Sequence, residues 1–373
     1  MTNYIKKKIP IILILCATLL SGCQIQSNPE RVNSQLKNEV QAYQVTFEKS
    51  GLRTYIDIYK KKLFYMEIDG NTSDFYVYDF ERGENKKIST ISNFALKGKS
   101  NTFVGDTLFF YISAYDGTEL ENVLYAMDFS TEKMRPVSKN SYSKKLIPLI
   151  TLDRKLLSLQ GKVSEKGTLT TFVEELRRDG TTERIPLNSG EGKDSRQMVS
   201  FDSDNECLYA IEKDRMDANL NCYLTKYNQD FSFNREVNIT DLFENYEIMD
   251  QIGSFFVFHD FVCLTDYSNN TIIFESKEDE IHVLLCENDM EYIVNNSSDS
   301  SYEYFYKRNT NDLYKLNTQT AEIQIQNYDL NNNSSTIRVV LSNQNDLMIV
   351  KTSEIADDHT ESIYLIPKID PTK

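Results

Sequence analysis

From about Gln44 onward, the chain consists of short runs of alternating apolar and polar residues separated by turn residues. An apolar residue at every second position places one face of a β-strand against a core. The pattern is clearest in Leu63–Ile68 followed by Phe75–Asp79, and in Thr107–Ile112 followed by Val123–Asp128. No long stretch repeats its apolar residues with the 3.6-residue period of a helix. The sequence therefore predicts an all-β protein.

The turns within these two pairs of runs repeat at a nearly constant spacing. Asp69-Gly70 and Asp116-Gly117 lie 47 residues apart, and Asp79 and Asp128, which end the second run of each pair, lie 49 residues apart. Asp-Gly between alternating runs is a strong hairpin signal, because both residues tolerate a positive φ. The spacing indicates a repeated unit built on a hairpin.

The paired runs recur five more times with decreasing clarity. They are Lys155–Leu159 with Thr171–Leu176, Cys207–Ile211 with Cys222–Tyr227, Phe261–Thr265 with Thr271–Glu275, Tyr302–Tyr306 with Asp312–Leu316, and Leu347–Val350 with Ser362–Ile366. A four-stranded unit repeated every 40–50 residues or so is typical of a β-propeller. The sequence predicts seven four-stranded blades over residues 43–373, and two β-sandwich domains are the alternative. We expect an early strand, Tyr43–Phe47 or Thr54–Tyr59, to close the ring by pairing with the last unit.

The repeated unit, with its aromatic run, turn, second run and short fourth strand such as Lys87-Ile88, resembles the degenerate propellers of secreted bacterial proteins. The similarity is to the TolB-like and the YWTD-type (low-density-lipoprotein-receptor-like) groups, and it covers roughly residues 45–370. The chain departs from the YWTD pattern, because it has no YWTD core and no tryptophan at all. The resemblance implies a rigid ring whose loops and central channel recruit partners.

Residues 1–22 have the features of a bacterial lipoprotein signal peptide. Lys6, Lys7 and Lys8 form a basic start, and Ile9–Leu20 is an apolar run too short to span a bilayer. Leu20-Ser21-Gly22-Cys23 then resembles the lipobox, which implies cleavage between Gly22 and Cys23 and a lipid on the Cys23 thiol. The polar residues 23–42 are predicted to form a flexible tether between the lipid and the propeller.

The lipid bilayer is thus the first predicted partner, reached through Cys23. The expected location is the extracytoplasmic face of the cell membrane, and a composition rich in Asn, Lys, Ile and Tyr is typical of a low-GC Gram-positive bacterium. The formal net charge is −15, and loss of the signal peptide, with three lysines and no acidic residue, makes it more negative still. Such a protein is repelled by phosphate backbones, which argues against nucleic acid as a partner.

Six cysteines occur, of which Cys16 leaves with the signal and Cys23 is lipidated. Cys207 and Cys222 flank one predicted hairpin, so they are a candidate disulfide in an exported protein. Cys263 and Cys286 complete the set, and no CxxC spacing is present. The alternative for all four is the role of a small buried hydrophobic residue.

Few residues suggest catalysis or metal binding. His259, His282 and His359 fall in different units, and the chain has no HExxH, GxSxG, P-loop or dinucleotide-binding motif. The acidic clusters 202–206, 278–280 and 357–358 lack the glycine and distant glutamate of a calcium loop, so solvated turns are the simpler interpretation. The sequence predicts no catalytic residue, metal site or cofactor.

Two functions remain after these exclusions. The first is a non-enzymatic binding or scaffold module for an extracytoplasmic protein or cell-envelope ligand. The second is an extracytoplasmic hydrolase with its site in the central channel, which would require carboxylates or histidines from several inner strands to converge there. A channel lined only by apolar, Asn and Ser side chains would exclude the hydrolase, and a cluster of three or more carboxylates or histidines would count against the scaffold.

Overall fold

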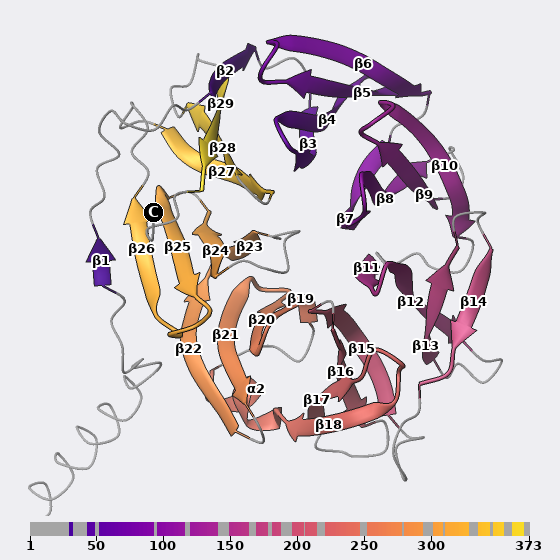
Figure 1. The fold of residues 1–373 in the computed structure, drawn as a ribbon, viewed down its shortest axis with the longest axis vertical. Helices are drawn as coiled ribbons and strands as arrows, with labels where there is room; N and C mark the ends of the chain where they lie inside the picture. Colours follow the sequence, from indigo (N-terminus) through magenta and orange to yellow (C-terminus); the bar gives the residue numbers. More distant parts are fainter. Residues whose placement is uncertain are drawn as a thin grey trace, which may run out of the picture.

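The protein is a seven-bladed β-propeller (Figure 1). The computed structural model describes residues 30–32, 43–48, 52–92, 95–115, 120–140, 149–163, 169–177, 181–187, 196–204, 206–214, 221–246, 252–277, 280–293, 301–308, 310–327, 335–343, 346–353 and 360–368. Each of the seven sheets is antiparallel over four strands, and one sheet carries a fifth, parallel strand. The predicted propeller is confirmed, and the alternative of two β-sandwiches is wrong.

Four consecutive strands form each of the first five blades, with the first strand innermost (Figure 1). The first blade comprises β3 (Leu52–Tyr59), β4 (Lys62–Asp69), β5 (Thr72–Asp79) and β6 (Glu84–Ile91), and the second comprises β7 (Ala95–Val104), β8 (Thr107–Tyr115), β9 (Leu120–Asp128) and β10 (Lys133–Asn140). The third comprises β11 (Leu149–Leu152), β12 (Lys155–Val163), β13 (Leu169–Leu176) and β14 (Thr182–Ile185), and the fourth comprises β15 (Arg196–Ser203), β16 (Leu208–Asp214), β17 (Cys222–Tyr227) and β18 (Phe233–Asn238). The fifth comprises β19 (Ile252–Phe258), β20 (Phe261–Asp266), β21 (Asn270–Lys277) and β22 (Glu280–Asn288). All seven predicted pairs of runs are the second and third strands of blades.

The last two blades use strands from both ends of the chain. The sixth blade comprises β23 (Met290–Ile293), β24 (Tyr302–Lys307), β25 (Asp312–Asn317) and β26 (Ile323–Asn327). The seventh comprises β27 (Ser335–Ser342), β28 (Asp346–Ser353) and β29 (Thr360–Pro367), with β2 (Tyr43–Glu48) as its outer strand. β2 pairs antiparallel with β29, so the first of the two predicted closures is confirmed. β1 (Glu30–Val32), which lies within the predicted tether, pairs parallel with β26 as a fifth strand.

The core lies between the blades. Seven apolar clusters each join two neighbouring blades, and alternate residues of a middle strand contribute to different clusters. In β4, Phe64 packs toward the second blade, where its ring centroid lies 5.4 Å from that of Phe110, while Tyr65 packs toward the seventh blade. Both faces of the middle strands are therefore buried, which explains why these runs are more continuously apolar than a half-exposed strand.

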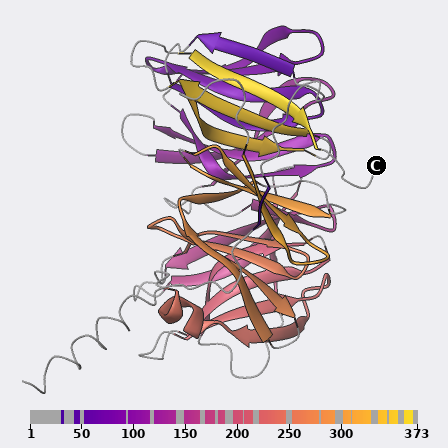
Figure 2. The ribbon, with the colours of Figure 1, turned by 90° about the vertical axis from the view of Figure 1, so that its left-hand side faces the viewer.

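The connections follow the predicted turn chemistry where the structure describes them. Gly70 has φ +57° between β4 and β5, a conformation that glycine adopts without strain. The predicted turn at Asp116-Gly117 lies outside the described residues. The side view in Figure 2 shows one short helix at the rim of the ring, α2 (Thr240–Asn245), whose Leu242 packs into the core between the fourth and fifth blades.

Candidate functional site

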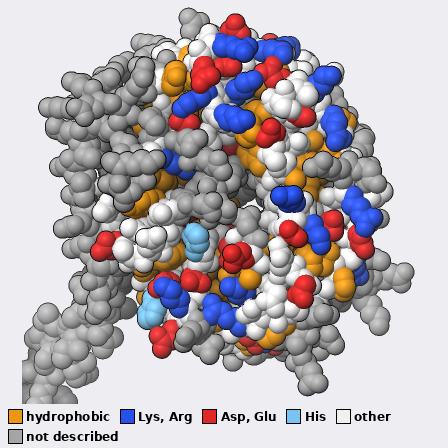
Figure 3. Space-filling model, viewed as in Figure 1, with side chains coloured by type: hydrophobic (Ala, Val, Ile, Leu, Met, Phe, Trp, Pro, Cys, Tyr) orange, Lys and Arg blue, Asp and Glu red, His pale blue; other side chains and the backbone are white. Residues whose placement is uncertain are grey.

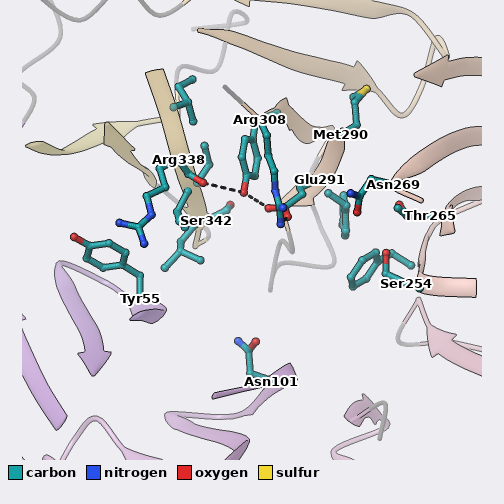
Figure 4. A pocket seen from close by; sticks show the side chains of 18 of the residues that line it. Tyr55, Asn101, Ser254, Thr265, Asn269, Met290, Glu291, Arg308, Arg338 and Ser342 are labelled. Carbon is teal, nitrogen blue, oxygen red and sulfur yellow. Dashed lines mark hydrogen bonds and ion pairs between the residues drawn. The ribbon is translucent and has the colours of Figure 1, made fainter. Parts of the chain in front are cut away.

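One cavity of about 730 Å³ lies in the central part of the ring, where the inner strands of five blades line it. Its walls come from β3, β7, β19, β23 and β27, and from the ends of β20 and β24 together with the residues that follow them. Figure 4 shows side chains of this wall pointing into the cavity from several blades. The polar ones include Tyr55, Asp57, Asn101, Ser254, Thr265, Asp266, Asn269, Glu291, Arg308 and Arg338.

Glu291, at the start of the sixth blade, is held by two donors, one within the neighbouring strand β24 and one directly after it. Arg308 pairs with its Oε1 through Nη2, and the Tyr306 hydroxyl donates to its Oε2 (Figure 4). Burial raises the pKa of Tyr306 above its usual range, so the hydroxyl keeps the proton that it donates. Both carboxylate oxygens of Glu291 are thus occupied, while the Arg308 side chain remains 51% exposed.

Arg338, on the inner strand of the seventh blade, is anchored from behind by Glu361. Arg338 Nη1 pairs with Glu361 Oε1, and the Tyr55 hydroxyl donates to Glu361 Oε2 at 2.6 Å. Glu361 is 1% exposed and also accepts from Arg53 Nη1 at 3.2 Å. Burial and the hydrogen bond to Glu361 raise the pKa of Tyr55. Arg338 therefore faces the cavity from a rigid support in the seam between the last and first blades.

The turn between β20 and β21 forms a further part of the rim. The Asp266 carboxylate accepts from the backbone N–H groups of Ser268 at 2.7 Å and Asn270 at 2.9 Å, which fixes the turn. Asn269 adopts φ +65°, which asparagine tolerates better than most residues. Tyr267 projects from this turn with 63% of its surface exposed.

The wall formed by the first and second blades carries Asp57 and Asn101. Asp57 Oδ1 accepts from the backbone N–H of Ile58 at 2.7 Å, and its Oδ2 accepts from the Asn101 side-chain amide. In Figure 4, Asn101 lies across the cavity from Arg308. Three carboxylates line the cavity, at Asp57, Asp266 and Glu291, and each already accepts protein hydrogen bonds. They come from three different blades and do not meet as the cluster that would count against a scaffold, since in the described ranges no three His, Cys, Asp or Glu side chains lie close enough to share a metal ion.

The residues that the sequence singled out lie elsewhere. Gly22 and Cys23 are outside the described residues, so the lipidation site stays a prediction. His259 occupies the β19–β20 turn, and His282 is on the outer strand β22, 3.4 Å from Glu280. Both belong to the fifth blade, so their assignment to different units is wrong. His359 is outside the described residues. Neither described histidine lines the cavity.

The predicted Cys207–Cys222 disulfide is wrong for this fold. In the described part of the chain, Cys207, Cys222, Cys263 and Cys286 form no disulfide. Cys222 pairs with Lys213 in the hairpin, whereas Leu208, next to Cys207, pairs with Tyr227. The two cysteines thus lie at opposite ends of the hairpin, about 20 Å apart at 3.3 Å per residue, and a disulfide needs Cα atoms within about 7 Å.

The acidic cluster at 202–206 serves the structure. Asp202 Oδ2 accepts from the backbone N–H of Val257 at 2.7 Å, which links the fourth and fifth blades, and Asp204 accepts from the Tyr209 hydroxyl at 2.9 Å. Burial raises the pKa of Asp202 to about 7. Within the described ranges, no three His, Cys, Asp or Glu side chains are arranged to hold a metal ion. In the same ranges, no helix is long and apolar enough to cross a membrane.

Sequence reasoning missed Arg308, Arg338 and Tyr267. Arg338 had a usable signal, because it is the one charged residue within the strand Ser335–Ser342. Arg308 and Tyr267 directly follow strands and had no signal beyond their place near a turn. On the face shown in Figure 3, Lys and Arg side chains are mixed with Asp and Glu, so the negative net charge forms no continuous acidic surface there.

Comparison with known proteins gives structural similarity alone. No family model and no curated protein matches the chain. Oligogalacturonate lyase from Vibrio parahaemolyticus is 12% identical with a TM-score of 0.49, over 93% of this chain and 100% of that one. The propeller domain of the trilobed protease from Pyrococcus furiosus is 12% identical with a TM-score of 0.44, over 70% and 80%. An acylaminoacyl peptidase is 13% identical with a TM-score of 0.49, over 85% and 52%.

Proposed function

We propose that the protein is a lipoprotein held on the extracytoplasmic face of the cell membrane by a lipid on Cys23. Its propeller would act as a non-enzymatic binding or scaffold module for a protein or cell-envelope ligand. The basic start, the short apolar run and the sequence Leu20–Cys23 support the anchor. A net charge of −15 argues against nucleic acid as the ligand.

The observation that carries the binding proposal is the cavity between the inner strands. Its volume of about 730 Å³ lies within the range of small-molecule sites, roughly 300–1,000 Å³. Hydrogen-bonding side chains reach it from several blades, so a ligand there would contact residues far apart in the chain (Figure 4). Such a site forms only in the closed ring.

The hydrogen bonds of the cavity favour binding over the alternative of an extracytoplasmic hydrolase. A general acid or base must be free to exchange a proton with the substrate. Glu291 is held by Arg308 and Tyr306, and Asp57 by Asn101 and a backbone N–H, so both carboxylates are held as acceptors. These residues stabilise the wall.

The anchor is tested by replacing the lipidated residue. Cys23→Ala should abolish incorporation of labelled palmitate and release the protein from the membrane fraction, whereas Cys286→Ala should leave both unchanged. Labelling that persists in Cys23→Ala would refute the lipoprotein proposal.

The binding site is tested by photo-crosslinking in intact cells. A photoreactive amino acid at Ser254, in the cavity wall, should trap the ligand, and the same group at Lys86, exposed on the outer strand β6, should not. Equal yields at both positions would show that this cavity is not the site. Turnover of a trapped saccharide or peptide by the purified protein would favour the hydrolase.

A further inference from the structure

Among the charged side chains of the cavity, the hydrogen-bonding capacity that remains is on the donor side. Glu291, Asp57 and Asp266 accept at both oxygens, and Glu361 behind the wall accepts from three side chains. A guanidinium carries five N–H donors. Within the described part of the chain, Arg308 uses only Nη2 and Arg338 only Nη1. The unused donors belong to two arginines that line the same cavity.

The two arginines are also held in fixed positions. Arg308 is tied to Glu291, and Arg338 to the buried Glu361. Tyr306 connects the two, because its hydroxyl contacts Glu291 and lies 3.5 Å from the backbone oxygen of Arg338 (Figure 4). Their side chains keep 51% and 37% exposure. A positioned planar guanidinium binds carboxylate or phosphate through two parallel hydrogen bonds, so little side-chain entropy is lost on binding.

The rim adds groups that suit a hydroxylated ligand. Tyr267, 63% exposed on a turn fixed by Asp266, presents an aromatic ring with a polar edge. The Ser254 hydroxyl and the Asn269 amide face the cavity near the same turn (Figure 4). An aromatic ring beside hydroxyl and amide groups can contact both the apolar face and the hydroxyls of a sugar ring.

From these observations we infer that the cavity binds an anionic saccharide, whose carboxylate or phosphate groups are held by Arg308 and Arg338 while a sugar ring lies against Tyr267. This inference rests on the proposed binding function and names its ligand class. The net charge of −15 repels anions at a distance, but salt screens that repulsion beyond about 8 Å at physiological ionic strength. Selectivity for the anion must therefore arise from direct contact with the two guanidinium groups.

Calorimetric titration of the purified protein tests the inference with three probes. They are trigalacturonate, which carries carboxylates, a galactose trisaccharide with phosphate on its 6-hydroxyls, and the same galactose trisaccharide without phosphate, which is neutral. At least one anionic probe should bind tenfold or more tightly than the neutral one. The anionic probe that binds more tightly shows whether the ligand carries carboxylate or phosphate groups.

Variants then assign the contacts. Arg308→Gln and Arg338→Lys should each weaken the anionic probe tenfold or more, because lysine keeps the charge beside Glu361 but loses the planar fork. Tyr267→Ala should weaken the saccharide probes generally. Arg82→Gln, at a 73% exposed arginine that pairs with Asp79 on the first blade, is the matched control and should bind like the wild type.

Three outcomes would overturn the inference: equal binding of the neutral and anionic probes, unchanged binding in Arg308→Gln and Arg338→Lys, or no binding of any probe. These failures are separable from failure of the proposed function. A protein trapped specifically at Ser254 in cells, with no saccharide bound in vitro, would keep the binding module and reject only the ligand class.

Discussion

The carboxylate of Glu361 is the most heavily used acidic group in the seam that closes the ring, and its replacement tests the structural reasoning most directly. It lies on β29, opposite Phe47 of the closing strand β2. It accepts from Arg53 and Tyr55 of the first blade and from Arg338 of its own. Glu361→Gln keeps the shape of the side chain and removes its charge.

The expected loss follows from the burial of the pair. Glu361 is 1% exposed and the Arg53 side chain 5%. Removing one partner of a buried ion pair costs about 3–5 kcal/mol, because the other charge is left without compensation. Arg53 keeps Glu67, to which its Nε donates at 2.8 Å, and glutamine still accepts one hydrogen bond. We therefore expect the unfolding free energy to fall by about 3 kcal/mol, the lower end of this range.

Urea denaturation followed by tyrosine fluorescence measures this change. With an m-value of about 3 kcal/mol/M, the midpoint should fall by about 1 M. Glu183→Gln is the matched control, because Glu183 pairs with Arg177 but is 57% exposed, and its effect should stay within about 0.5 kcal/mol. Tyr55→Phe combined with Glu361→Gln should cost less than the sum of the single changes, because both remove the same hydrogen bond. If the urea midpoint of Glu361→Gln matches that of Glu183→Gln, the stabilising role assigned to Glu361 in the seam is refuted.

Three further predictions concern other parts of the ring. Burial raises the pKa of Asp202 to about 7, so this carboxyl holds a proton in the folded protein that it releases above about pH 4 in the unfolded chain. The unfolding free energy should therefore fall as the pH rises from 4 to 7. Asp202→Asn should remove that slope and add about 1–2 kcal/mol at pH 8, as thermal melts across this range will show. Gly253→Ala should lower the unfolding free energy by about 1–3 kcal/mol, since a Cβ would lie 2.9 Å from the backbone oxygen of Asp266; an unchanged melting temperature would contradict this. Alkylation of the unfolded, unreduced protein should label Cys207 and Cys222, and mass spectrometry showing either one protected would restore the disulfide.

The blade repeat could be predicted because each middle strand carries its own local signal. In β4, Leu63 and Tyr65 face one neighbouring blade and Phe64 and Met66 the other, so the run is apolar throughout and bounded by turns. The closing strand could be narrowed to two candidates, because only an early strand can complete the last blade of a closed ring. The choice between them needed the register with β29.

The candidate site could not be predicted, because its residues have no common local pattern. Arg308 follows the second strand of the sixth blade, Arg338 lies within the first strand of the seventh, and Tyr267 stands on a turn of the fifth. They share one cavity only because the ring brings these blades together. The disulfide prediction failed for a related reason, since two cysteines that flank a hairpin can lie at opposite ends of it, and only the strand register decides.

Closure of the ring and formation of the cavity depend on the same carboxylate. Glu361 Oε2 accepts from Arg53 and Tyr55, which joins the blades, while Oε1 pairs with Arg338, which faces the cavity. Tyr55 itself lines that cavity. Loss of the Glu361 charge would therefore leave Arg338 without its support even in molecules that remain folded. Under conditions where Glu361→Gln is fully native, we expect it to weaken an anionic ligand as Arg338→Lys does, whereas Asp202→Asn, on the other side of the ring, should not.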